Sequence, residues 1–340
     1  MTTAVWLHNL SPILIELGPI PIRWYGLSYL AGFFVAFLMV KRVCRVGIST
    51  LLPDNAADLV VAVAIGIVLG GRLGYVLLYK PHMFIEFSKT LPFWDVLAIN
   101  KGGMASHGGM IGGMLGCLYY ARRNKHDFFY LADLFAFTAP LGIFFGRVAN
   151  FINGELLGRP CDPEFPLAVK FPQELFDAES IQLHEVYSAL PPPGSIVPGL
   201  TKWDEGIVVE LVQRGNAVVS RAVEPFLATR HPSQIYAGIT EGLIVLTVLA
   251  IIWVKPRKPG VIAGAFSMTY AVMRIINEFF RMPDAHLMDK EFAVLNITRG
   301  QWLSGLLFVF GVALVITSQK RSSTTMGGWL PIKKQSAVSS

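Results

Sequence analysis

The sequence predicts an all-α polytopic membrane protein with about seven transmembrane helices and an extracytoplasmic head of irregular and strand structure. Of its 340 residues, 53% are hydrophobic and only 15% are charged, whereas a soluble domain carries roughly 25% charged residues. A helix that crosses a bilayer needs about 20 mainly apolar residues, and seven stretches approach this length. They lie at residues 24–40, 57–79, 104–120, 131–149, 235–254, 260–280 and 302–318.

Basic residues between these stretches predict the orientation. Four clusters fall on one side of a membrane if there are seven spans, whereas six or eight spans would split them. Short cytoplasmic loops carry an excess of Lys and Arg, so we expect the N-terminus outside and the C-terminus in the cytoplasm. The clusters are Lys41, Arg42 and Arg45; Arg122, Arg123 and Lys125; Lys255, Arg257 and Lys258; and Lys320, Arg321, Lys333 and Lys334.

Four regions follow along the chain. Residues 1–154 hold the first four spans, 155–230 form the head, 231–318 hold the last three spans, and 319–340 form a cytoplasmic tail that we expect to be disordered. β-branched runs in the head, such as 207–209, favour strands. No basic region precedes the first apolar run, so we interpret that run as an uncleaved span and not as a signal peptide.

The composition argues against several function classes. The net charge is +6, but no basic stripe with interleaved aromatic residues indicates nucleic-acid binding. Cys44, Cys117 and Cys161 show no paired spacing, and the histidines form no His-Glu-x-x-His pattern, so neither a disulfide framework nor a metal site is predicted. No internal repeat is evident, which counts against a transporter built from inverted halves.

Glycines recur every four residues within the spans, a spacing that lets helix backbones approach closely. Examples are Gly66, Gly70 and Gly74, and Gly108, Gly112 and Gly116. The paired glycines around His107 are denser than packing requires, so we interpret them as positions that keep side chains away from the backbone beside a site.

Two arginines, Arg147 and Arg274, close apolar spans. An ionised side chain inside a bilayer costs at least about 2.5–3.5 kcal/mol, so each arginine should face a cavity or a partner and not lipid. Two arginines on different helices predict a shared anionic ligand. Arginine suits phosphate because its planar fork donates two parallel hydrogen bonds.

The sixth predicted span carries one polar face. At 100° per residue, this face holds Tyr270, Arg274, Asn277, Glu278 and Arg281. The functional interpretation is that Glu278 orients Arg274 toward a ligand. The alternative is an internal ion pair that serves only the fold.

Further polar residues lie at the ends of other spans. Asn150 lies one turn after Arg147, and Asn153 follows as the chain leaves the membrane. Arg72 is a third buried basic residue, which could instead pair with a carboxylate such as Asp133 as a structural lock.

His107 is the candidate acid–base residue. A histidine side chain suits proton transfer at neutral pH, although a lone histidine is more often structural. Tyr25 opens the first span at the same face, where aromatic residues are often only interface anchors.

Together these motifs resemble the prolipoprotein diacylglyceryl transferase family, from about Gly18 to about Thr317 and excluding much of 160–229. Ala237 stands where glutamate is common in that family, though Glu241 follows. The motifs are Trp24-Tyr25-Gly26, Gly71-Arg72-Leu73-Gly74-Tyr75, His107 through Gly112, residues 146–159, His231 through Tyr236, and Tyr270 through Arg281 followed by Pro283-Asp284.

The resemblance implies a multi-pass enzyme of the bacterial inner membrane. It would transfer the diacylglyceryl group of phosphatidylglycerol to the thiol of the lipobox cysteine in a prolipoprotein signal peptide, forming a thioether and releasing glycerol phosphate. Phosphatidylglycerol, prolipoproteins and membrane lipids are the implied partners, and the chemistry needs no cofactor.

The implied site residues fall into two overlapping groups. The predicted catalytic residues are Tyr25, His107, Arg147, Arg274 and Glu278. The predicted phosphatidylglycerol-binding residues are Arg147, Asn150, Asn153, Gly158, Tyr270, Arg274 and Arg281. We interpret Arg147 and Arg274 as a phosphate clamp, Glu278 as the residue that orients Arg274, and His107 as the base. The alternatives are a channel or transporter for an anionic solute or lipid, and a non-catalytic lipid-binding scaffold.

Overall fold

The computed structural model describes residues 5–18, 20–87, 93–98, 103–177, 181–282 and 298–331. The chain forms two compact units. Unit 1 comprises Met1–Gly32, Gly142–Val245 and Tyr270–Leu306, and unit 2 comprises Phe33–Leu141, Leu246–Thr269 and Leu307–Ser340.

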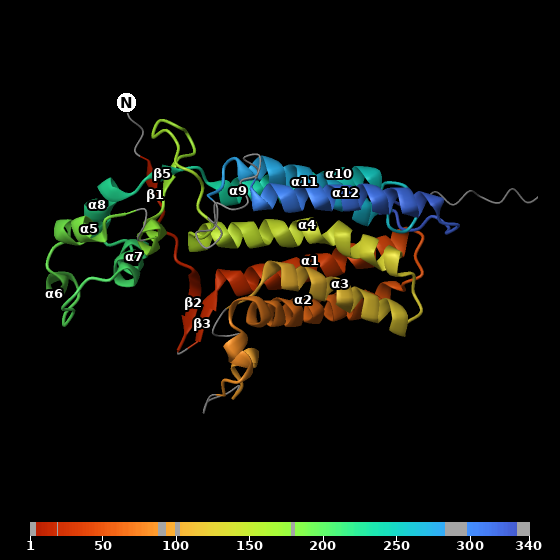
Figure 1. Ribbon diagram of the computed structural model, residues 1–340, viewed down its shortest axis with the longest axis horizontal. Helices are drawn as coiled ribbons and strands as arrows, with labels where there is room; N and C mark the ends of the chain where they lie inside the picture. Colours follow the sequence, from red (N-terminus) through yellow and green to blue (C-terminus); the bar gives the residue numbers. More distant parts are fainter. Residues whose placement is uncertain are drawn as a thin grey trace, which may run out of the picture. The chain divides into compact units, whose positions relative to one another are not determined.

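The protein is mostly helical (Figure 1), and a helix lies at each of the predicted spans. The helices are α1 (Trp24–Val46), α2 (Ala56–Tyr79), α3 (Ser106–Arg123), α4 (Phe128–Asn153), the continuous run of α9 (Ser233–Ala237), η7 (Gly238–Ile244) and α10 (Val245–Ile252), α11 (Val261–Glu278), and α12 (Arg299–Lys320).

Within the described ranges, five helical segments are long and apolar enough to cross a membrane. They are Trp24–Val46, Pro53–Tyr79, Phe128–Asn153, Ser233–Ile252 and Gly300–Lys320. α3 and α11 are less apolar: α3 carries five glycines and two arginines, and the last five residues of α11 include Arg274, Asn277 and Glu278. The prediction of a helical, polytopic membrane protein is thus confirmed, and the number of seven spans stays a prediction.

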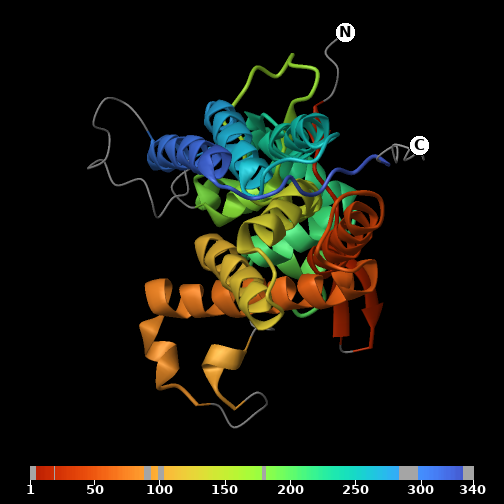
Figure 2. The ribbon, with the colours of Figure 1, turned by 90° about the vertical axis from the view of Figure 1, so that its right-hand side faces the viewer.

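In unit 2, α2 and α3 lie side by side (Figures 1 and 2) along the glycines spaced four residues apart. A methyl group on Gly70 would overlap the carbonyl oxygen of Gly108, and a methyl group on Gly66 would overlap that of Gly112. The close approach predicted from the small-xxx-small spacing is therefore present in this helix pair.

Asp133 of α4 is 1% exposed and stabilises the start of α11. It accepts hydrogen bonds from the amides of Gly260 at 2.8 Å and Ala263 at 2.7 Å. The first amides of a helix have no partner within it, and a carboxylate is favoured at that end. The Asp133 carboxylate therefore caps the start of α11. It does not form the ion pair with Arg72 that the sequence analysis gave as an alternative.

The C-terminal tail is more ordered than the sequence indicates. The amide of Met326 donates to the carbonyl of Arg257 at 2.7 Å, and the amide of Gly327 donates to that of Ile48 at 2.6 Å. The buried Trp253 indole also donates to the Met326 carbonyl at 3.2 Å. The expectation of disorder is therefore wrong for residues 321–331, because these hydrogen bonds fix the backbone, and residues 332–340 lie outside the described ranges.

Unit 1 carries two small sheets. β1 (Trp6–Leu7) pairs in parallel with β4 (Val169–Lys170), and β4 pairs antiparallel with β5 (Thr229–Arg230). β2 (Ile13–Leu17) and β3 (Ile20–Arg23) form a hairpin that leads directly into α1 (Figure 2).

The head is mainly helical between β4 and β5. Its elements are η5 (Pro172–Phe176), α5 (Leu183–Ala189), α6 (Pro193–Ile196), α7 (Glu205–Gln213), α8 (Ala217–Val223) and η6 (Glu224–Phe226).

The strand prediction for residues 207–209 is wrong, because these residues lie in α7. The Asp204 carboxylate accepts a hydrogen bond from the Ile207 amide at 2.9 Å and caps the helix. Val208 and Val212 are fully buried on one face, so packing at helical spacing overrides the β-propensity of this run.

Candidate active site

Four charged side chains from three helical segments of unit 1 form one cluster. Arg147 of α4 donates a hydrogen bond to Oε2 of Glu241 at 2.8 Å. Nη1 of Arg274, on α11, lies 3.7 Å from Oε1 of Glu241, and its Nη2 lies 2.9 Å from Oε2 of Glu278. Glu241 therefore bridges the two arginines that the sequence predicts as a clamp.

This cluster is buried. The Glu241 side chain is 0% exposed, and the side chains of Arg147 and Arg274 are 18% and 15% exposed. Taking charges out of water is costly, and buried ion pairs are often no more stabilising than the apolar residues that could replace them. The burial of these charges is therefore not by itself a gain in stability.

A π-helical turn, η7, carries Glu241 within the run from Ser233 to Ile252. Such turns insert extra backbone into an α-helix and are frequent at functional sites. Asn277 of α11 holds the turn through its side-chain amide, which donates to Thr240 Oγ1 at 2.5 Å and to Glu241 Oε1 at 3.3 Å. The carboxylate is thereby fixed between the arginines.

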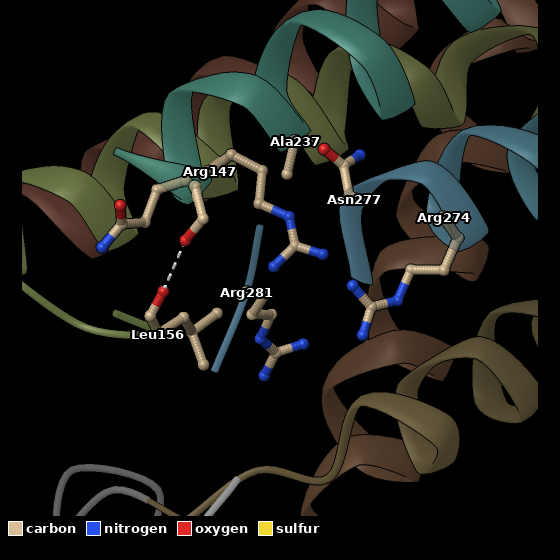
Figure 3. Close-up of a pocket in the computed structure, with 8 residues that line it drawn as sticks. Arg147, Leu156, Ala237, Arg274, Asn277 and Arg281 are labelled. Atoms are coloured by element: carbon tan, nitrogen blue, oxygen red, sulfur yellow. Dashed lines mark hydrogen bonds between the residues drawn. The ribbon is translucent and has the colours of Figure 1, made fainter. Parts of the chain in front are cut away.

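A small cavity lies beside the arginines (Figure 3). Its lining includes three arginines. The Leu156 carbonyl at its edge accepts from Ser233 Oγ at 3.1 Å. The lining residues are Arg147, Leu156, Ser233, Gln234, Ala237, Arg274, Asn277 and Arg281.

A second polar group lies in the same unit, where α1 begins and α4 ends. The Asn150 amide donates to Tyr25 Oη at 3.3 Å and to Glu155 Oε2 at 3.1 Å. Asn153 donates to the other oxygen of Glu155 at 3.3 Å. The structure thus brings together Tyr25, Asn150 and Asn153, which the sequence predicts separately.

Gly158 is required by a close backbone approach. A methyl group there would overlap the carbonyl oxygen of His231. Gly158 also forms an isolated bridge with Arg281, and its carbonyl accepts from Arg230 Nη1 at 3.0 Å. Gly158 therefore places the Arg281 backbone beside the cavity, and its predicted contact with phosphatidylglycerol stays a prediction.

The remaining predicted residues lie in different places. Tyr270 is partly buried, one turn before Arg274 on α11. The Glu278 carboxylate contacts Arg274 and also accepts from Thr298 Oγ1 at 3.2 Å. His107 is exposed in the first turn of α3, in unit 2, and its role as base stays a prediction. Pro283-Asp284, the end of the last motif, lies outside the described residues.

Glu241 is the site residue that the sequence analysis did not assign. The signal was present, because a carboxylate in the middle of the apolar stretch 235–254 marks a functional position by the same argument that singled out the arginines. Its partners could not be predicted, since they depend on the π-helical turn.

Fold and site together define a polytopic membrane protein whose buried arginines face a cavity suited to one anionic group. The sequence matches the prolipoprotein diacylglyceryl transferase family over residues 12–317. The chain therefore belongs to the prolipoprotein diacylglyceryl transferase family.

Individual relatives align over nearly the whole chain. A phosphatidylglycerol–prolipoprotein diacylglyceryl transferase of Bdellovibrio bacteriovorus is 42% identical, with 95% of this chain and 96% of that protein aligned. Proteins of the same name from Chromobacterium violaceum and Citrobacter koseri are 35% and 36% identical over 92% and 94% of this chain, and over 96% and 98% of their own lengths.

Proposed function

We propose that this protein transfers the diacylglyceryl group of phosphatidylglycerol to the thiol of a lipobox cysteine in a prolipoprotein. The names of its relatives support the substrates. The observation that carries the proposal is the pair of buried arginines, Arg147 and Arg274, joined by Glu241 beside a cavity lined by three arginines.

In the proposed reaction, the cysteine sulfur attacks the diacylglyceryl carbon bonded to the phosphate oxygen. A carbon–sulfur bond forms, the carbon–oxygen bond breaks, and glycerol phosphate leaves with the electron pair. The thiol proton passes to a base, for which His107 is our candidate, because an ordinary thiol is only a few per cent thiolate at pH 7.

The arginines would stabilise the charge that the leaving phosphate gains. Donors held in place before the reaction, in a site with little water, act more strongly than donors in solution. Glu241 and Glu278 would hold the guanidinium groups in position. Bound phosphate would share or replace the contact between Glu241 and Arg274, which at 3.7 Å is the longest in the cluster.

The outer polar group would complete the site. Asn150 orients the Tyr25 hydroxyl and the Glu155 carboxylate, so we assign Tyr25 and Asn150 to the substrate path. Gly158 and Arg281 would form its edge, and Tyr270 and Asn153 its flanks.

Labelled phosphatidylglycerol, incubated with the purified protein and a lipobox peptide, tests the proposal directly. We expect a labelled peptide that survives thioester-cleaving conditions, and none from a matched peptide with serine in place of cysteine. A channel, a transporter or a lipid-binding scaffold would leave both peptides unlabelled, which would reject the proposal.

We further propose seven spans in a bacterial inner membrane, with the N-terminus and the head outside and the C-terminus in the cytoplasm. An impermeant maleimide should label Cys161 of the head in intact spheroplasts. Burial, with the nearby Asp162 adding to it, raises the pKa of this thiol, so labelling is best done near pH 8.5. Cys44 and Cys117 are buried and serve as internal controls. Labelling of Cys161 only after the membrane is broken would reverse the orientation.

A further inference from the structure

We propose that Arg72 is a positioning residue for His107, because its guanidinium fixes the segment that leads into the first turn of α3. The inference rests on the proposed function, in which His107 takes the thiol proton. Arg72, His107 and the segment between them all belong to unit 2.

The Arg72 side chain binds the backbone of two described segments, 93–98 and 103–105. Its Nε donates to the carbonyl of Val96 at 2.8 Å and its Nη2 to that of Asp95 at 2.6 Å. Its Nη1 donates to the carbonyl of Gly103 at 3.1 Å. Arg72 is only 3% exposed, so a single rigid fork on α2 ties η3 (Asp95–Leu97) to the backbone that precedes α3.

The same stretch of α2 holds the next residues of the chain. The Ala105 amide donates to the carbonyl of Gly71 at 2.9 Å. Gly103 adopts φ +83°, and a methyl group there would overlap the Tyr75 ring. His107 follows Ala105 by two residues, so its backbone position is set by α2 on one side and by the Arg72 hydrogen bonds on the other.

This placement has consequences for proton transfer. A base must come within about 2.6–3.2 Å of the proton that it takes, and a misplacement of about 1 Å can cost on the order of 10²-fold in rate. Lysine at position 72 would keep the charge but not the planar fork, so it could not hold Asp95, Val96 and Gly103 in their present arrangement.

A double-mutant cycle tests the proposal. Arg72→Lys should lower kcat for transfer by about 10- to 100-fold, with KM for phosphatidylglycerol nearly unchanged because the donor site is assigned to unit 1. In a His107→Ala background, the same Arg72→Lys change should alter kcat by no more than about twofold. An equal loss in both backgrounds would overturn the proposal, and so would a fully active His107→Ala enzyme.

Two further variants distinguish a loss of His107 positioning from a general folding defect. Gly103→Ala disturbs the same segment without changing Arg72, and its loss should also disappear in the His107→Ala background. Arg321→Lys is the matched control, because Arg321 pairs with Asp127 at 3.0 Å in the same unit and should not couple to His107. Wild-type protein that labels no peptide would reject the proposed function instead of the role of Arg72.

Discussion

Two buried arrangements of arginine and glutamate in unit 1 differ in the groups that bind their remaining polar atoms. In the head, Arg230 and Glu174 form a short ion pair, and their side chains are 4% and 3% exposed. The backbone completes that pair, since Arg230 donates to the Gly158 carbonyl at 3.0 Å and Glu174 accepts from the Ala228 amide at 3.1 Å. In the cluster around Glu241, a second arginine and a cavity take the place of backbone groups.

The partners of a buried ion pair indicate whether it can bind a ligand. Backbone groups bind both members of the pair in the head, so this pair joins segments of the chain. The cavity beside Arg147 and Arg274 is lined by three arginines, and an anion can bind there. Burial alone does not separate the two cases, whereas the identity of the remaining partners does.

The largest expected effect is on catalysis at the open cluster. Arg147→Ala or Arg274→Ala should abolish transfer, a loss of at least about 10²–10³-fold for one preset donor, in a protein that still folds and inserts. Arg→Lys should rescue poorly, since a point charge cannot replace a bidentate fork. Steady-state transfer assays on membrane-inserted variants measure this, and near-normal rates in Arg274→Lys would contradict the clamp.

The next effect separates the two arrangements by stability. Glu241→Gln and Glu174→Gln each leave buried arginine without its carboxylate, so each should lower the free energy of unfolding by about 3–5 kcal/mol. Phosphatidylglycerol should restore stability to Glu241→Gln, because its phosphate can replace the missing charge, but not to Glu174→Gln. Thermal unfolding with and without the lipid compares the variants, and equal rescue of both would remove the distinction.

Replacing both the arginine and the glutamate of each pair tests the same comparison without leaving an unpaired charge. The double variant Arg230→Met/Glu174→Leu should be more stable than either single variant, because no unpaired charge stays buried, and should keep transfer within about tenfold of wild type. Arg147→Met/Glu241→Leu should also fold but make no product. Activity in this second double variant would show that the cluster is structural.

The smallest effect is a pH dependence confined to unit 1. His8 is 0% exposed and its ring lies 5.1 Å from Phe171. Burial lowers the pKa of His8 from 6.5 to about 4. The folded state resists protonation, so stability is greatest above pH 6.5 and falls by up to about 3 kcal/mol as the pH drops toward 4. His8→Phe should unfold with a flatter pH profile, and an unchanged profile would assign the effect to other groups.

Much of the site could be predicted from residues that are unusual in their surroundings. Arg147, Arg274 and Glu278 were predicted because charge is costly within apolar spans. Close helix approach was predicted from glycine spacing, since only small side chains permit it, and α2 and α3 show it. The structure also places Arg274 beside Glu278, while the roles of these residues in the reaction stay predictions.

Other features depend on contacts that no local pattern reveals. The bridging role of Glu241 requires the π-helical turn, and the partner of Asp133 is the start of a distant helix. The run at 207–209 favours strands by composition, but its burial at helical spacing decides otherwise. The tail after Lys320 is polar, and its order comes from backbone hydrogen bonds to Ile48 and Arg257.

Because of the π-helical turn at Gly238–Ile244, the position of the Glu241 carboxylate depends on the number of residues in its helix. Deleting one residue there would leave a stretch of the same hydropathy, still long enough to cross a bilayer. An ordinary α-helix advances about 100° per residue, so the shortened helix would rotate the Glu241 carboxylate away from one of its arginines or turn α10 out of its packing. This helix should therefore tolerate many apolar substitutions and yet fail on losing a single residue.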